Sequence, residues 1–175
     1  SFKGPVTVRD SLGNSLNIPA VKGLKAVGVE DFMAQATKMG ITTWIDPSRY
    51  GLSLTLGGGE VRMIDMAQTF GVLANGGVKV PLLPILEITN FRGEVIKQVN
   101  VEERKESLVY LTEFDGEEKE DDLIRVMDKA PAYMTAHIMQ DNNARVAAFG
   151  SRSQLVIPNQ VVSAKTGTTN NVKDN

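Results

Sequence analysis

The sequence predicts an α+β fold, and three observations support this prediction. Apolar residues recur at helical spacing in four separate stretches, each of which predicts a helix. Two runs with strand-like composition flank a turn at 90–93, which predicts a β-hairpin. A third apolar run, rich in β-branched residues, precedes the polar sequence 163–169 and predicts a buried strand. Helices and strands therefore fall in separate segments, as α+β folds require.

The first forty residues predict three helical segments joined by tight turns. The sequence 4–10 forms a turn that leads into a short helix. Asn17 suits the N-cap of a second helix, expected over about Asn17–Val27, because its side chain can accept a hydrogen bond from a free N–H group. Gly28 can end that helix. A third helix is expected over about Glu30–Met39.

Glycines separate the third helix from a fourth. Leu52, Leu54 and Leu56 alternate with polar residues over a short run, and the triple glycine 57–59 follows. The apolar face of the next stretch predicts a helix over about Val61–Ala74. The triple glycine lacks the Lys-Ser/Thr pair that follows a phosphate-binding loop, so we favour close backbone packing there.

The second half of the chain predicts the hairpin and one more helix. The hairpin is expected over about Ile85–Val99. A helix is expected over about Pro131–Gln140, and it contains His137, which is the single histidine of the chain. A lone histidine without a partner pattern is interpreted as structural. The stretch 142–158 is interpreted as a connection into the final strand.

Length and composition indicate one globular domain. The 175 residues, 42% of them hydrophobic, suffice for one core. A net charge of −2 gives no reason to expect a nucleic-acid partner. The lack of cysteine excludes disulfides and thiol catalysis, and no spacing of possible ligands predicts a metal site or a cofactor. No apolar run is long enough to span a bilayer, and no signal peptide is recognisable.

Acidic residues are concentrated in the stretch 102–122, called here the acidic segment. It holds ten Asp or Glu against three Arg or Lys, a net charge of −7, while the remainder carries +5. Like charges repel and leave little to bury, so we expect a mobile or peripheral lobe. Its apolar run Leu108–Leu111 is a candidate strand. A functional acidic patch is the alternative.

Two short polar sequences are candidates for chemistry. Ser15 and Asn17 lie two residues apart in a connection between helices, where both polar tips can face one cleft. A plain capping pair is the alternative, and it is locally favoured. The second sequence begins with Lys165 after the apolar strand. A phosphate-binding loop is excluded there because Gly167 follows the lysine instead of preceding it.

The sequence from Lys165 onward suits recognition of an extended peptide. Lys165 and the hydroxyls that follow it can hold a carboxylate, while the strand edge pairs with a peptide backbone. Gly167 permits close approach of that backbone. The alternative is a strand that runs into a polar turn. The candidate residues are Lys165, Thr166, Gly167, Thr168 and Thr169.

Together these sequences resemble the transpeptidase domain of a class A penicillin-binding protein, within the penicillin-recognising serine enzymes. Ser15-Leu16-Asn17 resembles the Ser-x-Asn motif of that family, and Lys165-Thr166-Gly167 resembles its Lys-Thr-Gly motif. The stretches 54–61 and 66–77 resemble the sequence between them. The resemblance implies a β-lactamase/transpeptidase-like fold, of which residues 1–175 form a part: mostly the helical lobe, with a hairpin and the Lys-Thr-Gly strand.

One departure from the family pattern bears on activity. The nucleophile of the family lies in a Ser-x-x-Lys motif, and no lysine of this chain has a serine three residues before it. The chain starts at Ser1 without a methionine and stops in the polar run 170–175, so both ends are interpreted as cuts. We therefore expect that the chain by itself is inactive and is not acylated by penicillin.

The resemblance also implies a reaction and roles for the residues. In that reaction a serine attacks the D-Ala-D-Ala bond of a stem peptide, and an amine of a second strand accepts the acyl group. Ser15 would pass a proton to the leaving nitrogen, Lys165 would keep the field positive, and Asn17 would bind the substrate's backbone amide. Thr166 and Thr168 would hold the terminal carboxylate, and the N–H of Thr168 would form half of the oxyanion hole. The implied substrate-binding set is Thr166, Gly167, Thr168 and Thr169.

The implied partners are the peptidoglycan stem peptide and β-lactam antibiotics. The parent protein is expected to be membrane-anchored, to carry a glycosyltransferase domain and to act outside the cytoplasm. The alternatives are a serine β-lactamase-like hydrolase, a non-catalytic binding module of the same fold, and a purely structural domain. If the resemblance holds, the Ser15 hydroxyl and the Lys165 ammonium face each other across one cleft, within about 10 Å.

Overall fold

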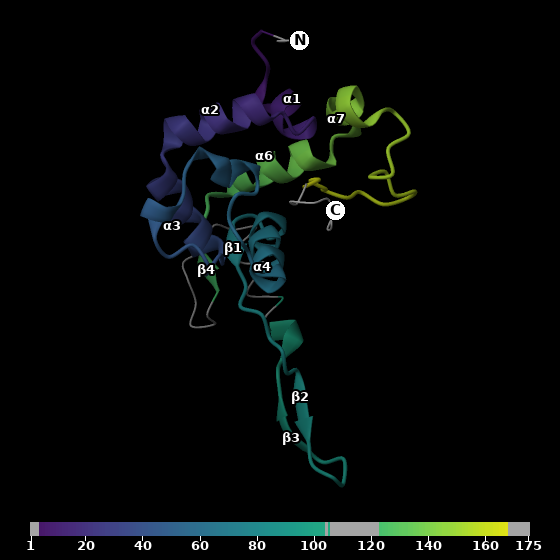
Figure 1. The fold of residues 1–175 in the computed structure, drawn as a ribbon. Helices are drawn as coiled ribbons and strands as arrows, with labels where there is room; N and C mark the ends of the chain where they lie inside the picture. The colour runs from purple at the N-terminus through teal and green to yellow at the C-terminus, as the bar shows by residue number, and fades with distance from the viewer. Residues whose placement is uncertain (1–3, 104, 106–122, 168–175) are drawn as a thin grey trace.

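The computed structural model describes residues 4–103, 105 and 123–167. These form a body of packed helices with two small antiparallel sheets, an α+β arrangement. Figure 1 shows α1 and α2 along one side of the body, α6 beside them, and a hairpin that projects away from the helices. The hairpin lies far from the end of the described chain.

The first three helices begin and end for local reasons. Helix α1 spans Val8–Gly13, and the Thr7 hydroxyl caps it by accepting a hydrogen bond from the Asp10 N–H. Helices α2 (Asn17–Val27) and α3 (Val29–Met39) meet at Gly28, whose φ of 96° suits glycine and ends the first of them.

The predicted N-cap of α2, Asn17, is wrong by one residue. The N-cap is Leu16, which has the extended backbone of a cap, and no side chain caps the helix there. Asn17 is already helical. The turn before α2 therefore closes one residue earlier than the capping pattern indicated, and the Asn17 side chain is not used as a cap.

The main apolar core lies between α2, α3 and two 3₁₀ helices. The 3₁₀ helices are η1 (Pro47–Arg49) and η2 (Leu52–Leu56), so the alternating leucines do not form a strand. Leu24, Met33 and Leu54 make the buried centre of this core. Trp44 extends it by stacking on Phe32, with ring centroids 5.9 Å apart.

Helix α4 (Met63–Ala74) leads into a short sheet that the sequence did not predict. Strand β1 (Val78–Lys79) pairs antiparallel with β4 (Ile124–Arg125), and this brings Val78 against the buried Leu123. Strands of two residues are too short for periodicity to reveal them.

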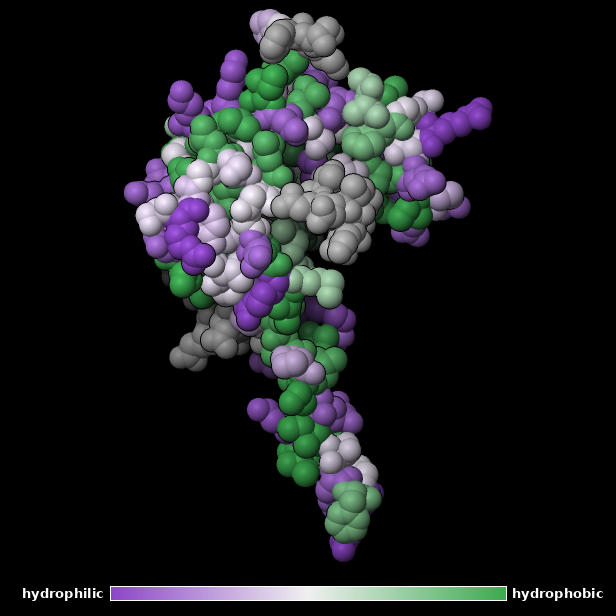
Figure 2. Space-filling model, in the orientation of Figure 1, coloured by the Kyte–Doolittle hydropathy of each residue, from purple (hydrophilic) through white to green (hydrophobic). Residues whose placement is uncertain are grey.

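The predicted hairpin is confirmed. Strands β2 (Glu87–Thr89) and β3 (Val95–Gln98) pair antiparallel, with Glu87 opposite Gln98. The side chain of Asn90 holds the turn by accepting hydrogen bonds from the N–H groups of Arg92 and Glu94. Every residue of both strands is exposed. Figure 2 shows apolar residues along the hairpin, between its polar ones.

The last two helices meet at a sharp corner. The predicted helix appears as α6 (Lys129–Gln140), and a further helix, α7 (Asn142–Phe149), follows after Asp141. The prediction of a plain connection over 142–158 is therefore wrong for its first half. The Asp141 carboxylate starts α7 by accepting a hydrogen bond from the Ala144 N–H at 3.1 Å.

The predicted buried strand is wrong for the described residues 161–167. None of them has strand geometry, and Val161 is 83% exposed. A strand needs a neighbouring strand to take up its backbone groups. In the segment 161–167 the Ala164 N–H instead donates a backbone hydrogen bond to the Met139 carbonyl, at the end of helix α6.

Most of the acidic segment lies outside the described residues, and so does the candidate strand Leu108–Leu111. Its described start carries an exposed ion pair of 2.7 Å between Lys105 and Glu102. The prediction of a mobile or peripheral lobe therefore stays a prediction. Among the helices of the described chain, none has the length and apolar character needed to cross a bilayer.

Candidate active site

Ser15 and Lys165 meet at the candidate active site. The Lys165 Nζ donates a hydrogen bond to the Ser15 Oγ at 2.7 Å and another to its neighbour's carbonyl, Thr166 O, at 2.6 Å. Both side chains belong to half-buried residues. The predicted proximity of these two residues is confirmed, because the distance is far below the 10 Å limit set above.

The backbone of Ser15 has a conformation that favours glycine. Its φ is 53°, in the left-handed region. Ser15 follows the C-cap of α1, where its N–H bonds to Leu12 O and the N–H of Leu16 bonds to Ser11 O. This is the Schellman pattern, whose left-handed position usually holds glycine. The left-handed conformation costs a residue with a Cβ roughly 1–2 kcal/mol of stability. Serine at this position is therefore less favourable for folding than glycine would be.

Two hydrogen bonds hold the chain next to Lys165 against α6. The Ser163 Oγ donates to Ala136 O at 2.8 Å, and the Ala164 N–H donates to Met139 O at 3.0 Å. Both acceptors belong to the last turns of the helix, whose C-terminal end attracts a cation. These bonds fix the backbone on which Lys165 is mounted.

Burial lowers the pKa of the Lys165 ammonium from its ordinary value of 10.5. Removal from water disfavours the charged form of a lysine. A lower pKa increases the fraction of neutral amine near neutral pH, which eases transfer of a proton between Lys165 and the Ser15 hydroxyl.

The other predicted site residues are placed only in part. Asn17 is exposed in the first turn of α2, Thr166 is half-buried, and Gly167 is exposed. Thr168 and Thr169 lie outside the described residues. The structure thus bears out the proximity of Ser15 and Lys165, while the roles of these two residues, of Asn17 and of the residues after Lys165 stay predictions.

A polar cluster between α1 and the end of α6 was not predicted from the sequence. Arg9 of α1 donates to the Asp141 carboxylate at 2.8 Å and lies 3.2 Å and 3.3 Å from Nδ1 of His137. The Ala144 N–H and Arg9 keep the pKa of Asp141 below its ordinary value. The cluster ties α1 to the corner between α6 and α7. The four-residue spacing of His137 and Asp141 was the available signal, because it places both on one face.

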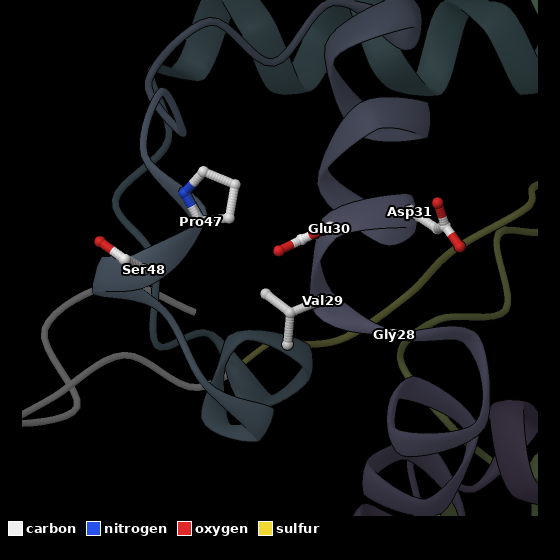
Figure 3. A pocket seen from close by; sticks show the side chains of 6 residues that line it. All are labelled: Gly28, Val29, Glu30, Asp31, Pro47 and Ser48. Atoms are coloured by element: carbon white, nitrogen blue, oxygen red, sulfur yellow. The ribbon is translucent and has the colours of Figure 1, made fainter.

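One pocket lies away from this site. It has a volume of about 410 Å³ and is found between the start of α3 and η1. Figure 3 shows Val29 and Glu30 directed toward Pro47, while Asp31 points to the other side of the helix. No group of side chains suited to a metal ion occurs within the described ranges.

Comparison with known proteins identifies the class. The whole chain, residues 1–175, matches the family described as the penicillin binding protein transpeptidase domain. The chain therefore belongs to the penicillin-binding protein transpeptidase family, the one that its motifs resemble.

Individual relatives agree with this assignment. Penicillin-binding protein 1A of Pseudomonas aeruginosa is 26% identical over 99% of this chain, and that of Neisseria flavescens is 30% identical over 99%. Penicillin-binding protein 1C of Escherichia coli is 35% identical over 43% of the chain. The chain spans 24%, 19% and 10% of the lengths of these three relatives.

Proposed function

We propose that this chain is part of a D,D-transpeptidase that cross-links peptidoglycan. Its substrate is the stem peptide that ends in D-Ala-D-Ala, and the reaction is acyl transfer through a serine acyl-enzyme. β-Lactams bind the same site. The single observation that carries the proposal is the hydrogen bond between Lys165 Nζ and Ser15 Oγ at 2.7 Å, made by residues of two motifs that lie far apart in the sequence.

This pair suits proton transfer in acyl transfer. The Ser15 hydroxyl both accepts and donates, so it can receive a proton from one side while it gives one to a leaving nitrogen. Lys165 keeps a positive field beside the hydroxyl and can restore the proton. The exposed Asn17 is available to hydrogen-bond the substrate's backbone amide.

The carboxylate of the substrate is assigned to the stretch after Lys165. Thr166 and Thr168 hold it, with Gly167 and Thr169 beside them, and the Thr168 N–H supplies half of the oxyanion hole. The exposure of Gly167 supports this assignment, because a peptide backbone can approach it.

The nucleophile belongs to a part of the domain outside this sequence, since the chain has no Ser-x-x-Lys. Residues 1–175 are thus a partial transpeptidase domain, inactive by itself. The parent is a membrane-anchored protein whose catalytic face lies outside the cytoplasm, with a glycosyltransferase domain. These features of the parent are what the resemblance to class A penicillin-binding proteins implies, and the relatives compared above are named penicillin-binding proteins 1A and 1C.

The test uses the longer protein that contains this chain and a Ser-x-x-Lys motif. A fluorescent penicillin should label it covalently, and a D-Ala-D-Ala stem peptide should slow the labelling. Ser15→Ala and Lys165→Ala should each slow acylation by about 10²–10⁴-fold. Rapid turnover of the penicillin would indicate a β-lactamase-like hydrolase instead. Reversible peptide binding without an adduct would indicate a binding module, and no interaction at all would indicate a structural domain.

A further inference from the structure

Asn14, the residue before Ser15, is buried and almost fully hydrogen-bonded. It is 7% exposed. Its Nδ2 donates to Asp10 O at 2.9 Å and to Ala144 O at 2.6 Å, and its Oδ1 accepts from the Ala148 N–H at 2.9 Å. Three of the four hydrogen bonds that an amide side chain can make are therefore formed, all with backbone groups.

Two of these three bonds lead to α7, a helix far away in the sequence. The turn also lies close to α7, because a Cβ on Gly13 would stand 3.2 Å from the Cβ of Ala144. Asn14 thus fastens the end of α1 to one side of α7. The turn that carries Ser15 begins at this fastened residue.

The Lys165 side of the site rests on the same corner. The Met139 carbonyl, at the end of α6, accepts hydrogen bonds from the Ala164 N–H and from the buried guanidinium of Arg145 in α7. Asp141 joins the two helices and caps α7. The two halves of the site therefore meet through one structural element, the corner between α6 and α7.

We propose that Asn14 is a positioning residue, which ties the Ser15 turn to α7 and thereby holds the Ser15 hydroxyl against Lys165. A left-handed serine persists only where its surroundings fix it. The Schellman bonds fix the turn on α1, and Arg9 ties the start of α1 to the corner. The bonds of Asn14 join the turn itself to α7, directly beside Ser15. The role builds on the function proposed above for Ser15 and Lys165.

The test measures Lys165 directly, in this chain, by NMR titration of lysine labelled with ¹³C at Cε. In Asn14→Ala the ammonium should lose the cover of the Ser15 turn, so its pKa should rise toward 10.5. A matched control is Gln35→Ala, which removes a side-chain bond of 2.8 Å to Val126 O far from the site. The control should lower the denaturation midpoint while the pKa of Lys165 stays at the wild-type value.

A folded Asn14→Ala protein with the wild-type pKa at Lys165 would overturn the proposal. If Asn14→Ala fails to fold, Asn14→Ser decides the question. Its hydroxyl can still bond Asp10 O within the turn but is too short to reach α7, so the same rise is expected and an unchanged pKa refutes the role. The readout needs no nucleophile. If penicillin labelling of the longer protein fails while the pKa rises, the proposed function fails and the positioning role stands.

Discussion

The Lys165 ammonium donates a 2.7 Å hydrogen bond to the Ser15 hydroxyl, across 150 positions of sequence. Ser15 reaches this contact from a left-handed turn, and Lys165 reaches it from a segment fastened to the last turns of α6. The left-handed backbone of Ser15 and the partial burial of the Lys165 ammonium both cost free energy. Neither feature improves the packing of the apolar core.

Two replacements of Ser15 should differ in their effect on stability but have the same effect on acylation. Ser15→Gly and Ser15→Ala both remove the hydroxyl, but only glycine relieves the left-handed backbone. We expect Ser15→Gly to be more stable than Ser15→Ala by about 1 kcal/mol, measured by urea denaturation of this chain. In the longer protein both variants should slow acylation similarly. Equal stabilities would contradict the left-handed assignment.

The contact between Ser15 and Lys165 predicts coupled effects in the longer protein. The change in activation free energy for the double variant, Ser15→Ala with Lys165→Ala, should be smaller than the sum of the two single changes. The reason is that each residue acts through the other. The measurement is the second-order rate constant of acylation by a labelled penicillin. Strict additivity would show that the two residues work independently.

The chain by itself should form no covalent adduct with a β-lactam. No lysine has a serine three residues earlier, so the nucleophile motif of the family is missing from these 175 residues. Mass spectrometry after incubation with a labelled penicillin should show the unmodified mass. A stable, stoichiometric adduct mapped to a residue of this chain would refute the prediction, and the longer protein serves as the positive control.

Asp65 should give the fold a characteristic pH dependence. It is buried at the start of α4 and accepts hydrogen bonds from Arg62 and Thr42, which lower its pKa from 3.8 to about 2. A lowered pKa stabilises the fold above pH 3.8, and this contribution is lost as the pH falls through about 2.

The comparison with Asp65→Asn measures that contribution. Above about pH 4 the variant should have a clearly lower free energy of unfolding than the wild type, because Arg62 loses its charged partner. The difference should shrink as the pH approaches 2. Urea denaturation over this range gives the curve. A difference that does not depend on pH would mean that the charge of Asp65 contributes nothing.

Gly77 should tolerate no side chain. Its φ is 94°, and a Cβ there would collide with the Met127 carbonyl oxygen. Gly77→Ala should therefore cost several kcal/mol, on the order of 3, from backbone strain and steric overlap together. The matched control is Gly23→Ala in the interior of α2, where the new Cβ meets nothing within 4 Å. That change should stabilise the protein by roughly 0.5–1 kcal/mol, and thermal or urea denaturation checks both.

Helix prediction succeeded where the apolar pattern was long. The second helix has the predicted bounds, Asn17–Val27, and the third, fourth and sixth differ from prediction by two residues or fewer at either end. Helix α7 was missed because its sequence begins with two asparagines and has a weak apolar face, while its start depends on the cap from Asp141. The prediction of a strand at 161–167 was wrong. The composition of this segment is typical of a strand, but within the described residues no strand pairs with it.

The sequence by itself determined the helices with a long apolar pattern, the hairpin, the family and the two motifs that hold Ser15 and Lys165, since these follow from local spacing and residue type. Only the tertiary structure decided that the two motifs meet, that Asn14 fastens one of them to α7, and that burial lowers the pKa of Lys165. The physical reason is that these features depend on contacts between segments more than a hundred residues apart, as the separations of 150 and 134 positions show. Packing of α1 against the α6–α7 corner sets such contacts, and no local pattern encodes them.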